Sequence, residues 1–237
     1  MGAMLLNDSV TGIVGMNVLA VVLIVARSWL FKTRLYRPML LNVGLSIAPV
    51  VVLLVAILAL AVLLNVDAPP VLILIVGLVL LAGWLLLLPN AGYLITELNL
   101  NHRRPGERVP EWYDILLVLS LAMSGVLNML FNIFLVQLGY VAIRFDDVDR
   151  LTSPEVNAVT AVVLLLAAFG IYLGRHLRLN SWDILRPWRI VSKLVAHLRG
   201  PGAALNALGF TVTAAVFFGL MYLVVAGPLL RAVQLFA

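Results

Sequence analysis

Long apolar segments separated by short polar connections dominate the pattern of side chains along this chain. Each segment has about 18 or more residues and few charges, which is the length that an α-helix needs to cross a bilayer. None of them alternates apolar and polar residues with a period of two, as a half-buried strand does. The pattern therefore predicts an all-α, polytopic integral membrane protein with six transmembrane helices, at about residues 10–31, 39–64, 71–88, 115–139, 156–174 and 204–230.

A shorter amphipathic segment, "RPWRIVSKLVAHLRG" (186–200), follows the fifth of these helices. Its apolar residues recur at helical spacing: Trp188, Val191, Leu194, Val195 and Leu198. Its basic residues fall elsewhere on the helix: Arg186, Arg189, Lys193 and His197. We expect an interfacial helix that lies on anionic headgroups, with His197 as a headgroup contact. A surface helix that only links two spans is the alternative.

Four polar residues repeat every fourth position in the fourth predicted helix: Ser120, Ser124, Asn128 and Asn132. This spacing puts them in one stripe along the helix. Such side chains commonly hold membrane helices together by hydrogen bonds. A polar path for a solute or ion is the second interpretation.

The third apolar segment ends in "LLLLPNAGYLITELNLN", which departs from a plain spanning helix. Pro89 removes a helical hydrogen bond, so we expect a kink or break there, followed by a short turn that carries Tyr93, Thr96 and Glu97.

Composition excludes a soluble globular protein, because 63% of the residues are hydrophobic, 11% are charged and the mean hydropathy is +1.11. The absence of cysteine excludes disulfides and a thiolate nucleophile within this chain. No Lys or Arg precedes Arg27, so we expect the first segment to be a retained helix and not a cleaved signal peptide. We expect one transmembrane domain over residues 1–237.

Charge predicts the orientation. The first, third and fifth connections carry four, three and six of the 16 Lys and Arg residues, so they are expected on the cytoplasmic side. Both termini are then extracytoplasmic, in a multi-pass protein of the plasma (inner) membrane. Because these cations flank membrane helices, we expect membrane lipids and not nucleic acid as partners. Protein partners stay open.

The third and fifth connections then bring a set of polar residues to one membrane face. Asp183, Asp114 and Glu97 are the candidate catalytic carboxylates. The candidate ligand-binding residues are Arg175, Arg178, Asn180, Asn90, Tyr93 and His102. Ionisable groups near hydrocarbon are costly unless they are paired or functional. We therefore expect Asp183 to face Arg175 or Arg178, directly or through one water.

A simpler interpretation is that Arg175 and Arg178 reach lipid phosphates and that Asp183 is their salt-bridge partner. A metal held by His102, Glu97, Asp114 and Asp183 is a weaker alternative, so no metal site is predicted. Common nucleotide-binding and hydrolase motifs are missing, and the cofactor is left unassigned.

Three segments carry a family resemblance: "LPNAGYLITEL", "PEWYD" and "YLGRHLRLNSWD". With them the chain resembles a bacterial and archaeal multi-pass membrane family catalogued as domain of unknown function 1361, over about residues 40–230. Glu97 stands where the resemblance implies Asp, and His176 stands where it implies an aromatic residue. The family has no assigned activity, so the resemblance implies only that the three segments belong to one shared unit.

Three functions fit these observations. The first is a cytoplasm-facing polar pocket that binds, and in one version chemically alters, an anionic or phosphate-bearing lipid. The second is a transporter for a small solute or ion along the stripe of the fourth helix. The third is a non-enzymatic membrane partner or assembly subunit. The sequence leaves open whether the protein is an enzyme.

Overall fold

The computed structural model describes residues 2–99, 107–177 and 187–236, and the regular structure in these ranges is helical throughout. The elements are α1 (Gly2–Leu30), α2 (Arg37–Asn65), α3 (Pro70–Tyr93), η1 (Leu94–Asn99), α4 (Glu111–Arg144), η2 (Val148–Thr152), α5 (Pro154–Leu177), α6 (Pro187–Leu198) and α7 (Ala203–Phe236). Within these ranges six helices are long and apolar enough to span a membrane, namely all but α6 and the two short 3₁₀ helices. The predicted all-α fold with six spans is confirmed.

Proline marks the first turn of four helices, at Pro38, Pro70, Pro154 and Pro187. The first turn has no intrahelical partner for its N–H groups, so a residue without this donor is tolerated there. Three helices end two residues before a residue with positive φ: Lys32, Asp67 and Asp146. A left-handed residue at this position turns the chain out of the helix. Local sequence thus sets where these helices begin and end.

The chain forms two compact units, which we describe separately. The N-terminal unit is Asn7–Asn132, and it contains most of α1, all of α2, α3 and η1, and α4 up to Asn132. The C-terminal unit is Ile133–Ala237 together with Met1–Leu6. The expectation of one transmembrane domain stays a prediction.

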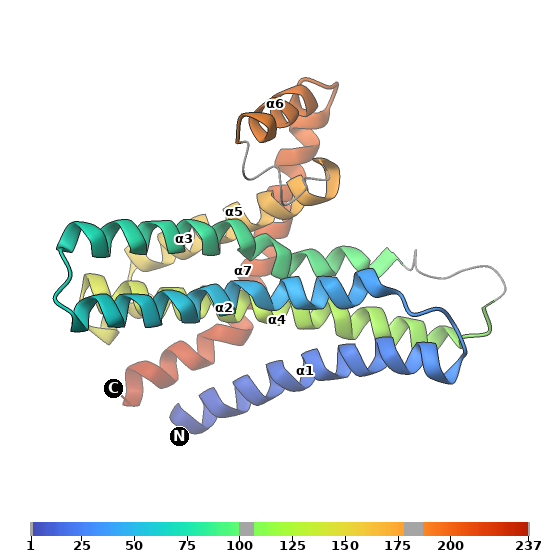
Figure 1. Ribbon diagram of the computed structural model, residues 1–237, viewed down its shortest axis with the longest axis horizontal. Coiled ribbons are helices and arrows are strands. Elements are labelled where there is room, and N and C mark those ends of the chain that lie inside the picture. Colours follow the sequence, from blue (N-terminus) through green and yellow to red (C-terminus); the bar gives the residue numbers. More distant parts are fainter. Residues whose placement is uncertain (1, 100–106, 178–186, 237) are drawn as a thin grey trace. The chain divides into compact units, whose positions relative to one another are not determined.

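The core of the N-terminal unit forms where α4 packs against its neighbours. α4 is the most buried of the spanning helices, with 61% of its most apolar 18 residues buried. Leu117 and Leu121 of α4 cluster with Ile24 of α1, Val43 of α2 and Leu94 of η1. α2 and α3 run side by side and antiparallel, joined by a short turn (Figure 1). Residues of α1, α2 and η1 therefore meet around α4.

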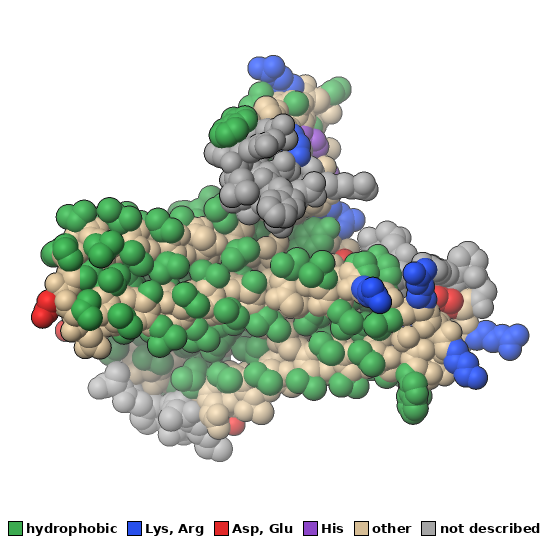
Figure 2. All heavy atoms as spheres, in the orientation of Figure 1, with side chains coloured by type: hydrophobic (Ala, Val, Ile, Leu, Met, Phe, Trp, Pro, Cys, Tyr) green, Lys and Arg blue, Asp and Glu red, His purple; other side chains and the backbone are tan. Residues whose placement is uncertain are grey.

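The surface of the N-terminal unit divides by residue type along its helices. Hydrophobic side chains cover the length of α2 and α3 (Figure 2). Lys and Arg side chains gather at the end of the unit where α1 ends and α2 begins (Figure 2). An apolar belt with basic residues at one end is the arrangement expected for helices that span a bilayer.

In the C-terminal unit α5 and α7 pack along each other, and η2 contacts both of them. Gln137 of α4 is 5% exposed and donates a hydrogen bond to the carbonyl of Leu151 in η2, at 2.8 Å. Its side-chain oxygen accepts from Thr160 of α5, at 3.2 Å, and from the hydroxyl of Tyr222 of α7. One buried amide therefore joins η2, α5 and α7 to the end of α4.

The predicted amphipathic helix is present as α6, which contacts α5 and α7. Trp188, Val191 and Val195 are exposed on one side of it. His197 has a partner within the protein, because its Nε2 lies 2.8 Å from the hydroxyl of Tyr172 in α5, and the expected headgroup contact stays a prediction. Part of the apolar face of α6 is thus exposed, while Leu194 and Leu198 of the same face are half-buried.

Of the kink or break predicted at Pro89, the break does not occur, because α3 continues through this proline to Tyr93, and the kink stays a prediction. The helix then tightens into η1, which carries Thr96 and Glu97 as expected for a short polar turn. Proline in a membrane helix is tolerated where neighbouring helices and small local adjustments satisfy the freed backbone groups.

Candidate functional site

The structure describes about half of the predicted site residues. Asp114, Glu97, Asn90 and Tyr93 belong to the N-terminal unit, and Arg175 is exposed in the last turn of α5 in the C-terminal unit. The remaining candidates lie outside the described residues: His102, Arg178, Asn180 and Asp183. The pairing of Asp183 with Arg175 or Arg178 therefore stays a prediction.

Asp114 is fully buried at the start of α4, where it forms an ion pair with Arg27 of α1. The Nε of Arg27 donates to Oδ1 of Asp114 at 2.7 Å. An Nη of the same guanidinium donates to Oε2 of Glu107, also at 2.7 Å. The side chain of Arg27 is 7% exposed and that of Glu107 is 15% exposed. One buried arginine thus bridges two carboxylates, and we call these three residues the ionic cluster.

Tyr113, the neighbour of Asp114, fixes the same end of α1. Its hydroxyl donates to the carbonyl of Leu23 at 2.9 Å, and its ring meets that of Phe31 edge to face, with the centroids 5.0 Å apart. Tyr113 is buried, whereas Trp112 is 60% exposed. The "PEWYD" segment therefore fastens α1 to α4 by one neutral and one charged side chain.

A cavity of about 390 Å³ lies beside the ionic cluster, at the connection between α1 and α2. It is lined by Arg27, Arg34, Leu35, Tyr36, Arg37, Pro38 and Glu107. Arg34 and Arg37 are exposed and make no ion pair with any residue that the structure describes. Because Arg27 is already paired with two carboxylates, these two guanidinium groups give the cavity its positive charge. Guanidinium groups bind phosphates and carboxylates through paired hydrogen bonds.

Glu97 of η1 is held by α2, because the Nδ2 of Asn42 donates to its Oε1 at 3.0 Å. In the preceding segment Leu88, Ala91 and Leu94 are fully buried, while Asn90 and Tyr93 are half-buried. The "LPNAGYLITEL" segment therefore serves packing on one side and leaves two polar residues partly accessible on the other.

A glycine of α4 explains why this segment packs so closely. A Cβ built on Gly125 would lie 2.4 Å from the carbonyl oxygen of Ala91 and 2.6 Å from the Cβ of Leu94. No other residue type leaves room for this approach of α4 to the end of α3.

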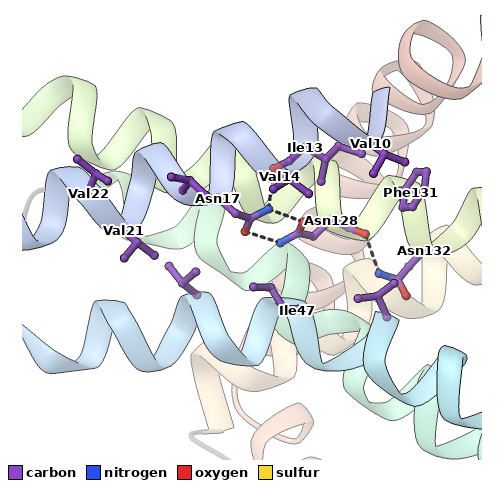
Figure 3. Close-up of a pocket in the computed structure, with 13 residues that line it drawn as sticks. Val10, Ile13, Val14, Asn17, Val21, Val22, Ile47, Asn128, Phe131 and Asn132 are labelled. Carbon is purple, nitrogen blue, oxygen red and sulfur yellow. Dashed lines mark hydrogen bonds between the residues drawn. The ribbon is translucent and has the colours of Figure 1, made fainter. Parts of the chain in front are cut away.

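The polar stripe of α4 is hydrogen-bonded to three other helices. Asn128 exchanges two hydrogen bonds with Asn17 of α1, at 2.9 and 3.0 Å, and donates to Ser46 of α2 at 2.9 Å. Asn132 accepts from the indole of Trp84 in α3 at 3.1 Å. The paired amides of Asn17 and Asn128 face each other in Figure 3. These contacts support the interhelical interpretation of the stripe.

An apolar groove of about 510 Å³ runs past these amides, between α1 and α2 (Figure 3). Its walls are mostly valine and isoleucine: Val10, Ile13, Val14, Val18, Val21, Val22, Val43, Ile47 and Val50. Asn17, Asn128, Phe131 and Asn132 complete the lining. We call this feature the valine groove.

Arg27 and Glu107 were not predicted from the sequence as members of a site. Arg27 counted only as a topological cation, although a lone arginine inside the last turn of an apolar helix is itself a signal that a partner is needed. Glu107 stands in a polar connection, where nothing in the pattern marks one carboxylate over another. Among the described residues no group of three His, Cys, Asp or Glu side chains is placed to hold a metal.

These features define the class of the protein, which is an all-α, multi-pass membrane protein with a buried ionic cluster at one end of its helices. Residues 41–225 match the sequence profile of the family described as protein of unknown function (DUF1361), so the chain belongs to this family. The match leaves out α1 and the connection that carries Arg34 and Arg37, and it includes Asp114 and Glu107. No curated protein and no solved structure matches the chain.

Proposed function

We propose that this protein binds an anionic, phosphate-bearing amphiphile from the cytoplasmic leaflet of the plasma membrane. The observation that carries the proposal is the cavity at the α1–α2 connection, where Arg34 and Arg37 have no ion-pair partner among the described residues. A phosphate diester offers the oxygen acceptors that two guanidinium groups require. Arg34 and Arg37 are therefore the anion-binding residues.

The ionic cluster supplies the rigid wall of this site. Arg27 is held on two sides, by Asp114 and Glu107, so it needs no further anion. Arg27 and Glu107 therefore form a fixed part of the cavity wall, and the cluster is not itself the anion receptor.

The valine groove provides a place for the acyl chain. It is formed by the same two helices, and Val22 lies about 8 Å along α1 from Arg27, at about 1.5 Å per residue. On α2, Val43 lies about 9 Å from Arg37 by the same measure. A molecule with an anionic head at the connection and an apolar chain between α1 and α2 would use both features.

Chemical change of the bound molecule requires a proton-transfer group next to it. Glu107 lines the cavity, whereas Asp114 is fully buried and does not. If the protein is an enzyme, Glu107 is a better candidate than Asp114 for the general acid or base, because it can reach a molecule in the cavity. The sequence also predicts a second polar site, and this site stays a proposal. Its residues are Arg175, Arg178, Asn180 and Asp183, with Glu97, Asn90, Tyr93 and His102.

The binding test compares lipids on the purified protein by native mass spectrometry, with phosphatidylglycerol and phosphatidylcholine as probes. We expect retention of phosphatidylglycerol over phosphatidylcholine, and a loss of about tenfold or more in this preference in the double variant Arg34→Gln and Arg37→Gln, because charge-assisted hydrogen bonds contribute about 1.5–3 kcal/mol each. Arg199→Gln, an exposed arginine outside the cavity, is the matched control. Equal retention of both lipids by the wild type would refute the proposal.

The orientation is tested by single cysteines, since the chain has none of its own. We expect a cysteine at Lys193 to be protected from an impermeant reagent in intact cells, and a cysteine at Asp67 or Asp147 to react. The reverse pattern would move the site to the outer face.

A further inference from the structure

A second groove, of about 620 Å³, lies in the C-terminal unit between α5 and α7. Its sides are apolar and include Leu164, Val216, Leu220 and Leu223. One end is polar, where Thr152, Asn157 and Arg231 line it. Its volume is within the range of about 300–1,000 Å³ that small-molecule sites occupy. We call it the α5–α7 groove.

The polar groups on the floor of this groove are already satisfied. Thr160 and Tyr222 both donate to the side-chain oxygen of Gln137, and the amide nitrogen of Gln137 donates to Leu151. An occupant therefore does not have to supply hydrogen bonds at this depth. The body of the groove suits an apolar chain.

The polar end carries a positive charge without a described counter-ion. Arg231 is exposed and makes no ion pair with the residues that the structure describes, whereas Arg150 of η2 lies 3.8 Å from Asp147. A Cβ at Gly227 would lie 3.9 Å from an Nη of Arg231, so the guanidinium passes directly over this glycine. Gln234, one turn later, donates to the carbonyl of Asp149 at 3.1 Å and ties α7 to η2.

We propose that the α5–α7 groove binds an anionic phospholipid, with its phosphate at Arg231 and one acyl chain beside Leu164 and Leu220. The argument is charge complementarity: an apolar groove that ends at a cation with no ion-pair partner among the described residues matches a molecule with an apolar chain and one anionic group. Arg231 follows the last predicted span and Thr152 follows the fourth, so both are expected on the extracytoplasmic side. This site would take its lipid from the leaflet opposite the proposed arginine cavity.

Gly219 lines the groove and has no side chain of its own, so a larger residue at this position provides a way to block it. A Cβ on Gly219 would contact only the Cδ1 of Leu164, at 3.9 Å, so a longer side chain can be added without a clash at its base and would extend into the groove. Gly209 on the same helix has no atom within 4 Å of a built Cβ and does not line the groove. Gly219→Leu and Gly209→Leu are therefore a matched pair.

The experiment uses the full-length protein in vesicles with a phosphatidylglycerol probe that carries a photoreactive group in its acyl chain. Cross-linked peptides are assigned by mass spectrometry. We expect labelling of α5 and α7, reduced about tenfold or more by Arg231→Gln, since a charge-assisted contact is lost. Arg150→Gln should leave it unchanged. Gly219→Leu should reduce labelling strongly and Gly209→Leu should not.

Two outcomes would overturn the proposal. Equal labelling by a phosphatidylcholine probe, insensitive to Arg231→Gln, would mean that only ordinary boundary lipid is present. Labelling that is absent in wild type, with a dimer that Gly219→Leu converts to monomer, would mean that a second copy of the chain fills the groove. Labelling of α1 and α2 peptides in the same sample reports on the arginine cavity independently, so the two proposals can fail separately.

Discussion

Arg27 and its neighbours Arg34 and Arg37 carry the same guanidinium group within eleven residues of one another, yet their surroundings differ completely. Arg27 has a side chain that is 7% exposed and is paired with two carboxylates. Arg34 and Arg37 are exposed and are unpaired among the described residues. A buried charge must be compensated within the protein, whereas an exposed charge is solvated and can exchange its partner. The comparison separates residues that hold the fold from residues available for binding.

The largest effect is expected from Asp114→Asn, which removes one of the two charges that compensate Arg27. We expect the free energy of unfolding in detergent to fall by about 3 kcal/mol, at the lower end of the range for broken buried pairs because Glu107 still contacts the arginine. Glu111→Gln, an exposed carboxylate one turn earlier, is the control. A variant that melts with the wild type would show that Arg27 is not buried in the way the comparison requires.

A second variant tests whether close packing in the same unit contributes as much to stability as the buried ion pairs do. Gly125→Ala would place a methyl group 2.4 Å from the carbonyl oxygen of Ala91, so α4 or the end of α3 must shift. Overpacking of this kind costs about 1–3 kcal/mol. Gly83→Ala, where no atom lies within 4 Å, should be neutral or slightly stabilising. Thermal unfolding of both variants measures the difference, and equal melting temperatures would contradict the close approach.

The neutral counterpart of the ionic cluster is the amide pair of Asn17 and Asn128. Asn128→Leu removes three interhelical hydrogen bonds, and we expect a loss of about 1–2 kcal/mol, since such bonds in membranes average about 0.6 kcal/mol each. Ser124→Ala is the control, because the hydrogen bond that Ser124 donates goes to Leu121 of its own helix. If the two variants lose the same stability, the stripe is not what joins α4 to α1 and α2.

The smallest effect on stability is expected from the two exposed arginines, for which the expected effect on lipid binding is largest. The double variant Arg34→Gln and Arg37→Gln should change the free energy of unfolding by less than about 0.5 kcal/mol, as surface substitutions usually do. Lipid-free protein is used for this measurement, because a bound lipid would itself stabilise the wild type. A marked loss of stability without lipid would place these arginines in the fold and remove the contrast with Arg27.

The surroundings of Asp114 show which parts of the site could be predicted from the sequence and which could not. Asp114 was identified as a candidate because a carboxylate at the mouth of an apolar helix is costly without a purpose. Its partner was not identified, because Arg27 is 87 positions away and the pattern treats every arginine in a connection alike. The same holds for Asn128: its need for a partner follows from its depth, but the choice of Asn17 and Ser46 does not.

The sequence by itself determined the helices, because the length and apolarity of each segment and the prolines at helix starts act locally. It also determined that the stripe of α4 must find hydrogen-bond partners, since an unsatisfied amide in hydrocarbon is costly. Tertiary structure alone decided which arginine is buried, where the cavity and the grooves open, and that His197 contacts Tyr172. These depend on contacts between segments far apart in the chain, and the energy of such a contact is a property of a pair of positions that no local pattern contains.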